Sequence, residues 1–381
     1  MAIYLDNAAT SYPKPEAVYQ AVEDYQRNIG VSPGRGAYQR ALQAEQLVFN
    51  TRRALGQLFN ISDLSRIIFT ANVTEALNLA LKGLLGPEDH VITTSIEHNA
   101  VWRPLMHLKK ERNIRVTRLA NPEGCQLDVA ELEEVLGPGA ELVVVNHASN
   151  VTGAIMPLQE IGSLCQEYEV PLLFDSAQTA GVLPIDVEKA GISLLGFTGH
   201  KGLLGPTGTG GLYLAPEIEL KPLKEGGTGS KSYLETQPED LPDRYESGTP
   251  NTMGLAGLKA GVEYILDRGL DEIRARELQL TEMLLEKLNR LEGCEVYGPG
   301  SARERVAVVS FNLASIPAAE AAYVLDEVYD IMVRAGLHCA PVIHRELGLE
   351  NRGSLRVSPG LFTEKEELDQ LEKALEEILA R

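Results

Sequence analysis

The sequence contains little cysteine and little positive charge. Its 381 residues include four cysteines, which lie far apart and form neither a CxxC pair nor the Cys/His spacing of a zinc site. Lysine and arginine total 35 against 54 acidic residues, and a formal net charge of −19 argues against binding to nucleic acid or anionic lipid. These absences predict no disulfide framework, no metal site and no nucleic-acid partner.

The chain also lacks long apolar segments. No run approaches the roughly eighteen residues of a membrane span, and the first residues lack the basic and apolar regions of a signal peptide. We therefore expect no membrane partner and a cytoplasmic location. Repeats and low-complexity tracts are missing too, so a hydrophobic content of 44% predicts a globular protein. A length of 381 residues suggests two domains.

Short apolar runs alternate with helical patterns from about residue 40 to residue 215. The runs predict strands at residues 66–70, 90–94, 115–119, 142–146, 171–175, 194–198 and 211–214. Strands separated by helices predict an α/β fold with a mainly parallel, doubly wound sheet. Ligands of such folds bind beyond the carboxyl ends of the strands, so the residues that follow each run are the candidates for a site.

The last third of the chain has a different pattern. Residues 253–290 predict one long helix or two. The segments after it predict a smaller α+β domain, with strands at 306–313, 331–335 and 354–358 and helices at 317–329 and from residue 363 onward. We place the domain boundary near residue 255, so that residues 16–255 form the large domain and residues 1–15 and 256–381 form the small one.

Two charged residues stand at predicted strand ends. Lys201 lies near the start of the glycine-rich segment 197–211, where desolvation could release its proton near neutral pH and allow Schiff-base formation. A solvated lysine beside a tight turn is the other interpretation. Asp175 ends an apolar run, where a carboxylate needs a cation such as a pyridinium nitrogen, although it could equally cap the next helix.

Polar residues follow three further strands. Residues 69–78 predict a strand end, a turn and a helix N-terminus with Asn72 or Thr74 near the cap, which could bind phosphate or be an ordinary cap. His98 could stack on an aromatic cofactor and exchange protons near pH 7, or be structural. Asn150 could donate a hydrogen bond to a phenolate or a carboxylate, or stabilise a turn.

Two residues of the C-terminal third are candidates for contact with substrate. Cys339 lies on a Gly/Pro-containing loop beside Arg334, His338 and His344, and basic neighbours favour the reactive thiolate. An unreactive loop thiol is the alternative. Arg356 lies within an apolar strand pattern, where its charge requires a partner, either a substrate carboxylate or an internal salt bridge.

Taken in order along the chain, these residues resemble the cysteine desulfurase and selenocysteine lyase family, within the fold-type I, class V aminotransferase superfamily. The resemblance runs through residues 4–10, 97–98, 175–178, 199–201, 245–251 and 334–339. It implies a pyridoxal 5′-phosphate (PLP)-dependent transferase fold of type I. In that fold a large domain has a mainly parallel seven-stranded sheet sandwiched by helices, and a small α+β domain follows at the C-terminus.

The resemblance also implies a role for each matching residue. PLP would form a Schiff base with Lys201, with its ring held by Asp175, His98, Gln178 and Asn150. Its phosphate would be held by Val73, Thr74, Thr198 and His200, and completed across a homodimer interface by Thr249 and Thr228 of the other subunit. Cys339 would be the nucleophile, and the substrate would be bound by Arg356, Asn150, Arg334 and Arg35.

On this resemblance we predict a cysteine desulfurase or selenocysteine lyase. It would convert L-cysteine or L-selenocysteine to L-alanine and leave a persulfide or selenopersulfide on Cys339, with Lys201 or His98 moving the Cα proton. A protein or a small thiol would then accept the sulfur. The alternatives are a class V aminotransferase, or another PLP lyase without a covalent sulfur step, and a non-catalytic PLP-binding scaffold for iron–sulfur assembly.

Overall fold

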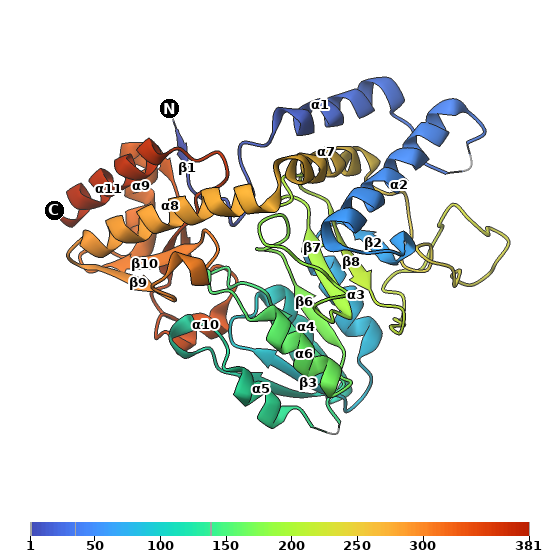
Figure 1. Cartoon of the computed structure of the whole chain (residues 1–381), viewed down its shortest axis with the longest axis horizontal. Helices are drawn as coiled ribbons and strands as arrows, with labels where there is room; N and C mark the ends of the chain where they lie inside the picture. Colours follow the sequence, from blue (N-terminus) through green and yellow to red (C-terminus); the bar gives the residue numbers. More distant parts are fainter. Residues whose placement is uncertain (1, 35, 138, 381) are drawn as a thin grey trace.

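A seven-stranded sheet forms the centre of the computed structural model, which describes residues 2–34, 36–137 and 139–380 (Figure 1). The strand order is β2-β8-β7-β6-β5-β3-β4, and among the described strands of this sheet β8 runs in the direction opposite to the other six. The strands are β2 (Ile67–Thr70), β3 (His90–Thr94), β4 (Arg115–Leu119), β5 (Leu142–Asn146), β6 (Leu172–Asp175), β7 (Leu194–Thr198) and β8 (Gly210–Leu214). The predicted, mainly parallel sheet is thus confirmed.

The burial of the strands explains why the sequence pattern identified them. Every residue of β5, β6 and β7 is buried, which is typical of parallel strands covered by helices on both faces. At the edge of the sheet, β4 exposes Arg115 and Arg118, and charged side chains discourage pairing with another chain. The flanking helices are α1 (Glu16–Asp24), α2 (Gln39–Phe59), α3 (Val73–Leu84), α4 (Asn99–Arg112), α5 (Val129–Val135), α6 (Leu158–Glu167) and α7 (Thr252–Arg268).

The strand register brings the predicted site residues to one edge of this sheet. Asn146 lies beside Asp175, and Asp175 lies beside Gly196 on the next strand. Because parallel strands end at the same edge, the segments that follow β3, β5, β6 and β7 are neighbours in space.

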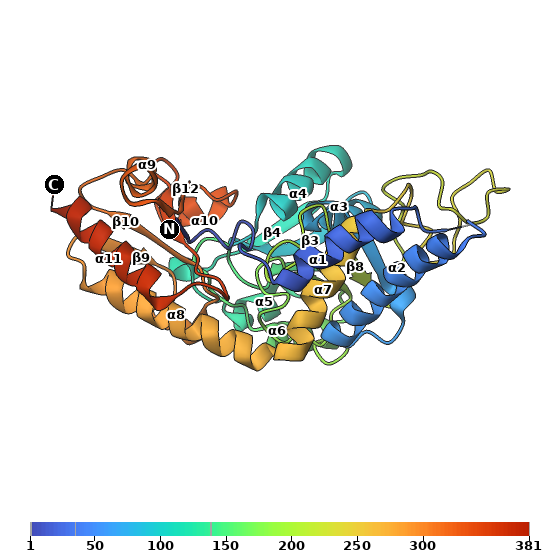
Figure 2. The same cartoon turned by 90° about the horizontal axis from the view of Figure 1, so that it is seen from above.

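A smaller part contains a four-stranded antiparallel sheet in the order β12-β13-β10-β9. Its elements are α8 (Leu270–Arg290), β9 (Cys294–Tyr297), β10 (Val309–Leu313), α9 (Ala318–Tyr329), β11 (Ile331–Met332), β12 (Arg334–Gly336), α10 (Pro341–Glu346), β13 (Ser354–Val357) and α11 (Lys365–Leu379). The N-terminal strand β1 (Ile3–Tyr4) pairs in parallel with β11, so the start of the chain reaches this part (Figure 2). The sequence pattern had not indicated β1 or β9. It predicted one strand at residues 331–335, where the structure has two, β11 and β12.

Two apolar cores correspond to the two parts. α7 packs on α1 and α2 and contributes to the larger core, whereas α8 contributes to the smaller core from Leu280 onward. The predicted division near residue 255 stays a prediction. Within helices α7 and α8, the last buried residue that belongs to the larger core is Ile273, in α8. No helix among the described residues is long and apolar enough to cross a membrane.

Candidate active site

A cavity of about 210 Å³ lies where the carboxyl edge of the large sheet faces the smaller part. Its lining includes the predicted residues Val73, Thr74, His98, Asn150, Asp175, Gln178, Thr198, His200, Lys201, Arg334, Cys339 and Arg356, together with Ala8, Ala9, Asn72, Asn146, Ala177 and His338. Thr228 and Thr249 do not line it, and Arg35 lies outside the described residues. The fold therefore gathers residues from both ends of the chain around one space.

Lys201 and Asp175 carry opposite charges on the sheet side of the cavity. Burial is the main cause that lowers the pKa of Lys201 to about 8; Asp175 opposes this shift, and the charges of Arg356 and Arg334 contribute to it. Burial also raises the pKa of Asp175. Two effects oppose this rise: the N–H of Ala177 donates a hydrogen bond to Asp175 Oδ1 at 2.9 Å, and Lys201 is positively charged. A carboxyl group this buried favours a cationic partner in the cavity, and a lysine with this pKa is partly neutral near pH 8.

His98 forms the N-terminal cap of α4. Its Nδ1 accepts a hydrogen bond from the N–H of Ala100 at 3.0 Å, so the neutral ring carries its proton on Nε2. Burial lowers the pKa of His98 to about 4, and the nearby charges of Lys201 and Arg334 add to this effect. Proton exchange near pH 7, which the sequence suggested for His98, is therefore disfavoured in this structure because the ring sits among cations in a desolvated site.

The N-terminus of α3 forms one end of the cavity. Asn72 is the capping residue, so the backbone N–H groups of Val73 and Thr74 begin the helix without intrahelical partners. The Oγ1 of Thr198 and the Nδ1 of His200 are buried there and have no hydrogen-bond partner among the described residues. Free helical N–H groups beside unpaired polar atoms are suited to an anion such as a phosphate.

Asn150 lies at the opposite side, within a tight buried turn. At Gly153 the φ angle is +75°, and a β-carbon would lie 2.4 Å from the Val308 carbonyl oxygen, so only glycine fits. The Oδ1 of Asn150 is buried without a partner in the described chain, and the Nε2 of Gln178 donates to the carbonyl of Ala8 at 3.2 Å. The amide of Asn150 thus retains an unused acceptor at the cavity.

Cys339 occupies an exposed loop between β12 and α10. Both His338 (φ +46°) and Cys339 (φ +57°) have left-handed backbone conformations, which are unfavourable for residues other than glycine. Hydrogen bonds from the larger part hold this conformation: the N–H of Asn99 donates to the Cys339 carbonyl at 2.7 Å, and the Nδ2 of Asn150 donates to the His338 carbonyl at 2.6 Å.

The two histidines beside Cys339 differ from the sequence prediction, because they are buried and neutral. His338 Nε2 lies 3.0 Å from the carbonyl oxygen of Ser354, and His344 Nδ1 lies 2.9 Å from that of Ala340, so each of these nitrogens donates. His344 Nε2 then accepts from the Ser354 hydroxyl at 3.2 Å. Burial lowers the pKa of His338 to about 2 and also lowers that of His344. Of the predicted basic neighbours, only Arg334 remains a cation.

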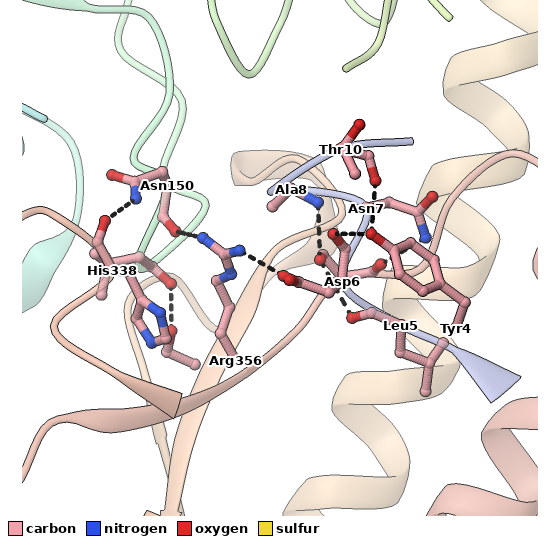
Figure 3. Close-up of polar contacts among 12 residues, drawn as sticks. Tyr4, Leu5, Asp6, Asn7, Ala8, Thr10, Asn150, His338 and Arg356 are labelled. Atoms are coloured by element: carbon pink, nitrogen blue, oxygen red, sulfur yellow. Dashed lines mark hydrogen bonds and ion pairs between the residues drawn. The ribbon is translucent and has the colours of Figure 1, made fainter. Parts of the chain in front are cut away.

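Arg356 links the N-terminal segment to the cavity, as Figure 3 shows. It is 2% exposed, and its guanidinium donates to Asp6 Oδ1 at 2.6 Å and to the carbonyl of Asn150 at 3.1 Å. The hydroxyl of Tyr4 donates to the carbonyls of Asp6 and Thr10, which fixes this segment. The sequence left an internal salt bridge open for Arg356 but did not identify Asp6 as its partner.

The resemblance runs through Glu97, but sequence reasoning assigned this acid no role. Glu97 is fully buried, and its Oε1 accepts from the hydroxyl of Thr94 at 2.7 Å and from the N–H of Asn146 at 3.0 Å. Burial raises the pKa of Glu97 to about 8, and the nearby charge of Asp175 adds to the rise. An acid directly before His98 at a strand end was the available signal.

Comparison with known proteins gives one consistent family. The family model described as "Aminotransferase class-V" matches residues 3–371. A probable cysteine desulfurase from Pyrococcus abyssi is 36% identical, over 99% of this chain and 94% of the relative. The apo structure of a cysteine desulfurase from Thermococcus onnurineus superposes with a TM-score of 0.94 at 32% identity, covering 100% of this chain and 95% of that chain. A cysteine desulfurase from Escherichia coli in an S-sulfonic acid form gives 0.89 at 28%, with the same coverage.

Proposed function

The chain belongs to the class-V aminotransferase family, and on this premise we propose that it is a PLP-dependent cysteine desulfurase. The observation that carries the proposal is the position of Cys339, an exposed thiol on the same cavity as Lys201 and Asp175. A thiol at this place can reach the sulfur of an amino acid held in the cavity.

The residues of the cavity fit PLP. The α3 N-terminus, Thr198 and His200 would hold its phosphate, and Asp175 would pair with its ring nitrogen. We propose that Lys201 forms the Schiff base with PLP, because its lowered pKa provides a neutral amine. When bound, PLP supplies an electron sink for the carbanion at the substrate Cα.

The side chains of the protein then have distinct tasks. Arg356 would bind the substrate carboxylate, with Arg334 beside it, and Lys201 Nζ would remove the Cα proton. We assign the proton to Lys201 and not to His98, because Nδ1 of His98 is already an acceptor within α4 and its pKa is about 4. The Cys339 thiolate would attack the substrate sulfur, so that an S–S bond forms while the C–S bond breaks. The electron pair of the C–S bond stays with Cβ, which takes up a proton to become the methyl group of the alanine that leaves.

A homodimer belongs to the same proposal. Thr249 lies by a separate surface hollow with Glu246 and Gly248, and Thr228 contacts Ser230, so neither reaches the cavity of its own chain. We propose that both complete the phosphate site of the other subunit. We also propose a cytoplasmic location, where the four free cysteines stay reduced.

The test is a single-turnover assay with L-cysteine that follows alanine and the mass of the Cys339 peptide. We expect one alanine per site and a persulfide on Cys339. C339A should bind PLP with an unchanged absorbance and release no sulfur, whereas C125A, which removes another partly accessible thiol, should behave as wild type. Full desulfurase activity in C339A would overturn the assignment. Amino transfer without modification of Cys339 would favour the class V aminotransferase, and PLP binding without turnover would favour the scaffold.

A further inference from the structure

A second hollow, which we call the outer hollow, opens on the other side of Cys339. It measures about 430 Å³ and is lined by Thr74, Asn78, Lys82, His98, Asn99, Ala100, Arg103, Pro104, His107 and Cys339. Most of these residues belong to α3 and α4. The two helices pack against each other (Figure 2). Cys339 lines both the outer hollow and the cofactor cavity, as do Thr74 and His98, so the two spaces adjoin at these residues.

The charge of the outer hollow is opposite to that of the chain as a whole. Lys82 from α3 and Arg103 from α4 line it, and neither forms an ion pair within the described residues. His107 adds a third basic group, which lies 3.0 Å from Glu111 outside the lining. No acidic residue occurs in the described lining, although the protein carries a net charge of −19. Two cations without an ion-pair partner in the described chain, one half-buried and one exposed, favour an anionic ligand over a cationic one beside the Cys339 thiol.

We propose that the outer hollow binds the sulfur acceptor, and that this acceptor is a small thiol that carries a carboxylate. The inference rests on the desulfurase function proposed above. A hollow of this volume has the size of a small-molecule site. The acceptor thiolate would attack the outer sulfur of the Cys339 persulfide and form a new S–S bond with it. The old S–S bond then breaks, its electron pair leaves with the Cys339 thiolate, and the acceptor departs as a persulfide without any external oxidant.

The experiment measures discharge of the Cys339 persulfide from the holoenzyme. Persulfide is formed with one equivalent of L-cysteine, and its loss is followed by mass with 3-mercaptopropionate, 2-mercaptoethanol or cysteamine at equal thiolate concentration. We expect discharge to be fastest with the anionic 3-mercaptopropionate, slower with the neutral 2-mercaptoethanol and slowest with the cationic cysteamine. The double variant K82Q/R103Q should slow the reaction with 3-mercaptopropionate by about fivefold and leave 2-mercaptoethanol unchanged, in line with partly exposed ion pairs. K109Q, on α4 outside the lining, is the control with the same type of charge change.

Formation of alanine in the first turnover separates this inference from the proposed function. If the wild type forms no alanine, the desulfurase assignment itself fails. If alanine forms but K82Q/R103Q slows that step as much as it slows discharge, the outer hollow is a substrate entrance and the inference is wrong. Equal rates with all three thiols, an equal loss in K109Q, or discharge only by a protein acceptor would overturn it too.

Discussion

The cavity has two walls that are built in different ways. The sheet wall consists of segments that follow parallel strands and carries Asp175, His98 and Lys201. The loop wall comes from the smaller part and carries Cys339 and Arg356. On the sheet wall Asp175 is buried, His98 and Lys201 are half-buried, and desolvation shifts the pKa values of all three. On the loop wall the nucleophile is exposed, at the tip of a turn with two left-handed residues.

This difference matches what the two walls have to do. Charges that tune a cofactor need a fixed, water-poor position, and neighbouring strands provide it. A sulfur that must meet substrate on one side and acceptor on the other needs access to both. The turn of Cys339 is nevertheless fixed, because Asn99 and Asn150 of the larger part hold its carbonyls. A substitution on the loop wall should therefore leave the PLP absorbance, which reports on the sheet wall, unchanged.

The largest effect is expected on the sheet wall. K201A should lower the rate of alanine formation by about 10³-fold or more, because both the Schiff-base amine and the Cα base are lost. The measurement is single-turnover alanine release together with the PLP absorbance. K14A is the control: Lys14 is also a partly buried lysine with a pKa lowered to about 8 by burial, but it does not line the cavity. Comparable losses in K14A and K201A would contradict the assigned role.

On the loop wall, R356Q should act on substrate binding. We expect kcat/KM for L-cysteine to fall by about 10²–10³-fold, because the substrate carboxylate and Asp6 both lose their cation. The PLP absorbance should stay unchanged, since Asp175 and Lys201 lie on the other wall.

A companion variant, D6N, keeps the guanidinium and removes only its carboxylate partner. We expect a smaller loss in D6N than in R356Q, seen mainly in KM. A changed PLP absorbance in R356Q, or a larger defect in D6N, would show that the walls are not separable.

The two walls also differ in how far the sequence predicts them. Most strand limits of the large sheet and the positions of Asp175 and Lys201 could be predicted, because alternating apolar and helical patterns are local and strand ends share one edge. The same reasoning placed Asn72 or Thr74 near the cap of the next helix, and the structure shows that Asn72 is the capping residue.

The loop wall depends on contacts between distant residues, which no local pattern encodes. The partner of Arg356 is Asp6, 350 positions away in the sequence. His338 and His344 were interpreted as basic neighbours of Cys339, yet burial around Ser354 makes them neutral. The pKa of His98 was misjudged for the same reason, since desolvation is a property of the folded protein.

A pH-dependent stability difference tests the buried acid beneath the sheet wall. Glu97 has a pKa of about 8 in the folded protein and a usual value of 4.5. Between these two pH values the folded state keeps a proton that the unfolded state has lost. Its contribution to stability therefore falls as pH rises from 4.5 to 8. E97Q should remove that loss, so that its stability relative to wild type improves by about 3 to 4 kcal/mol between pH 5 and pH 8.

The measurement for E97Q is urea unfolding of the apoprotein at several pH values. E133Q changes an exposed carboxylate on α5 and serves as the control. If the free energies of unfolding of E97Q and wild type changed with pH in parallel, Glu97 would be ionised in the folded protein. The assignment of a buried, protonated acid beneath the sheet wall would then be wrong.

The smallest effect is expected from S354A, which acts behind the loop wall. The substitution deletes the hydroxyl that donates to His344 Nε2 and lies 3.2 Å from His338 Nε2, and it leaves a buried ring nitrogen without a partner. We expect a loss of about 1 kcal/mol in stability. Because His338 precedes the nucleophile, persulfide formation should slow by about threefold while the PLP absorbance stays the same.

The control for S354A is S193A, which removes a partly buried serine hydroxyl that accepts from the N–H of Leu172 at 3.2 Å, at the amino end of the large sheet. S193A should lose similar stability and keep the wild-type rate of persulfide formation. If both variants slow that step equally, Ser354 acts only through general stability. If S354A alone alters the PLP absorbance, the loop wall controls the sheet wall, and the separation between them fails.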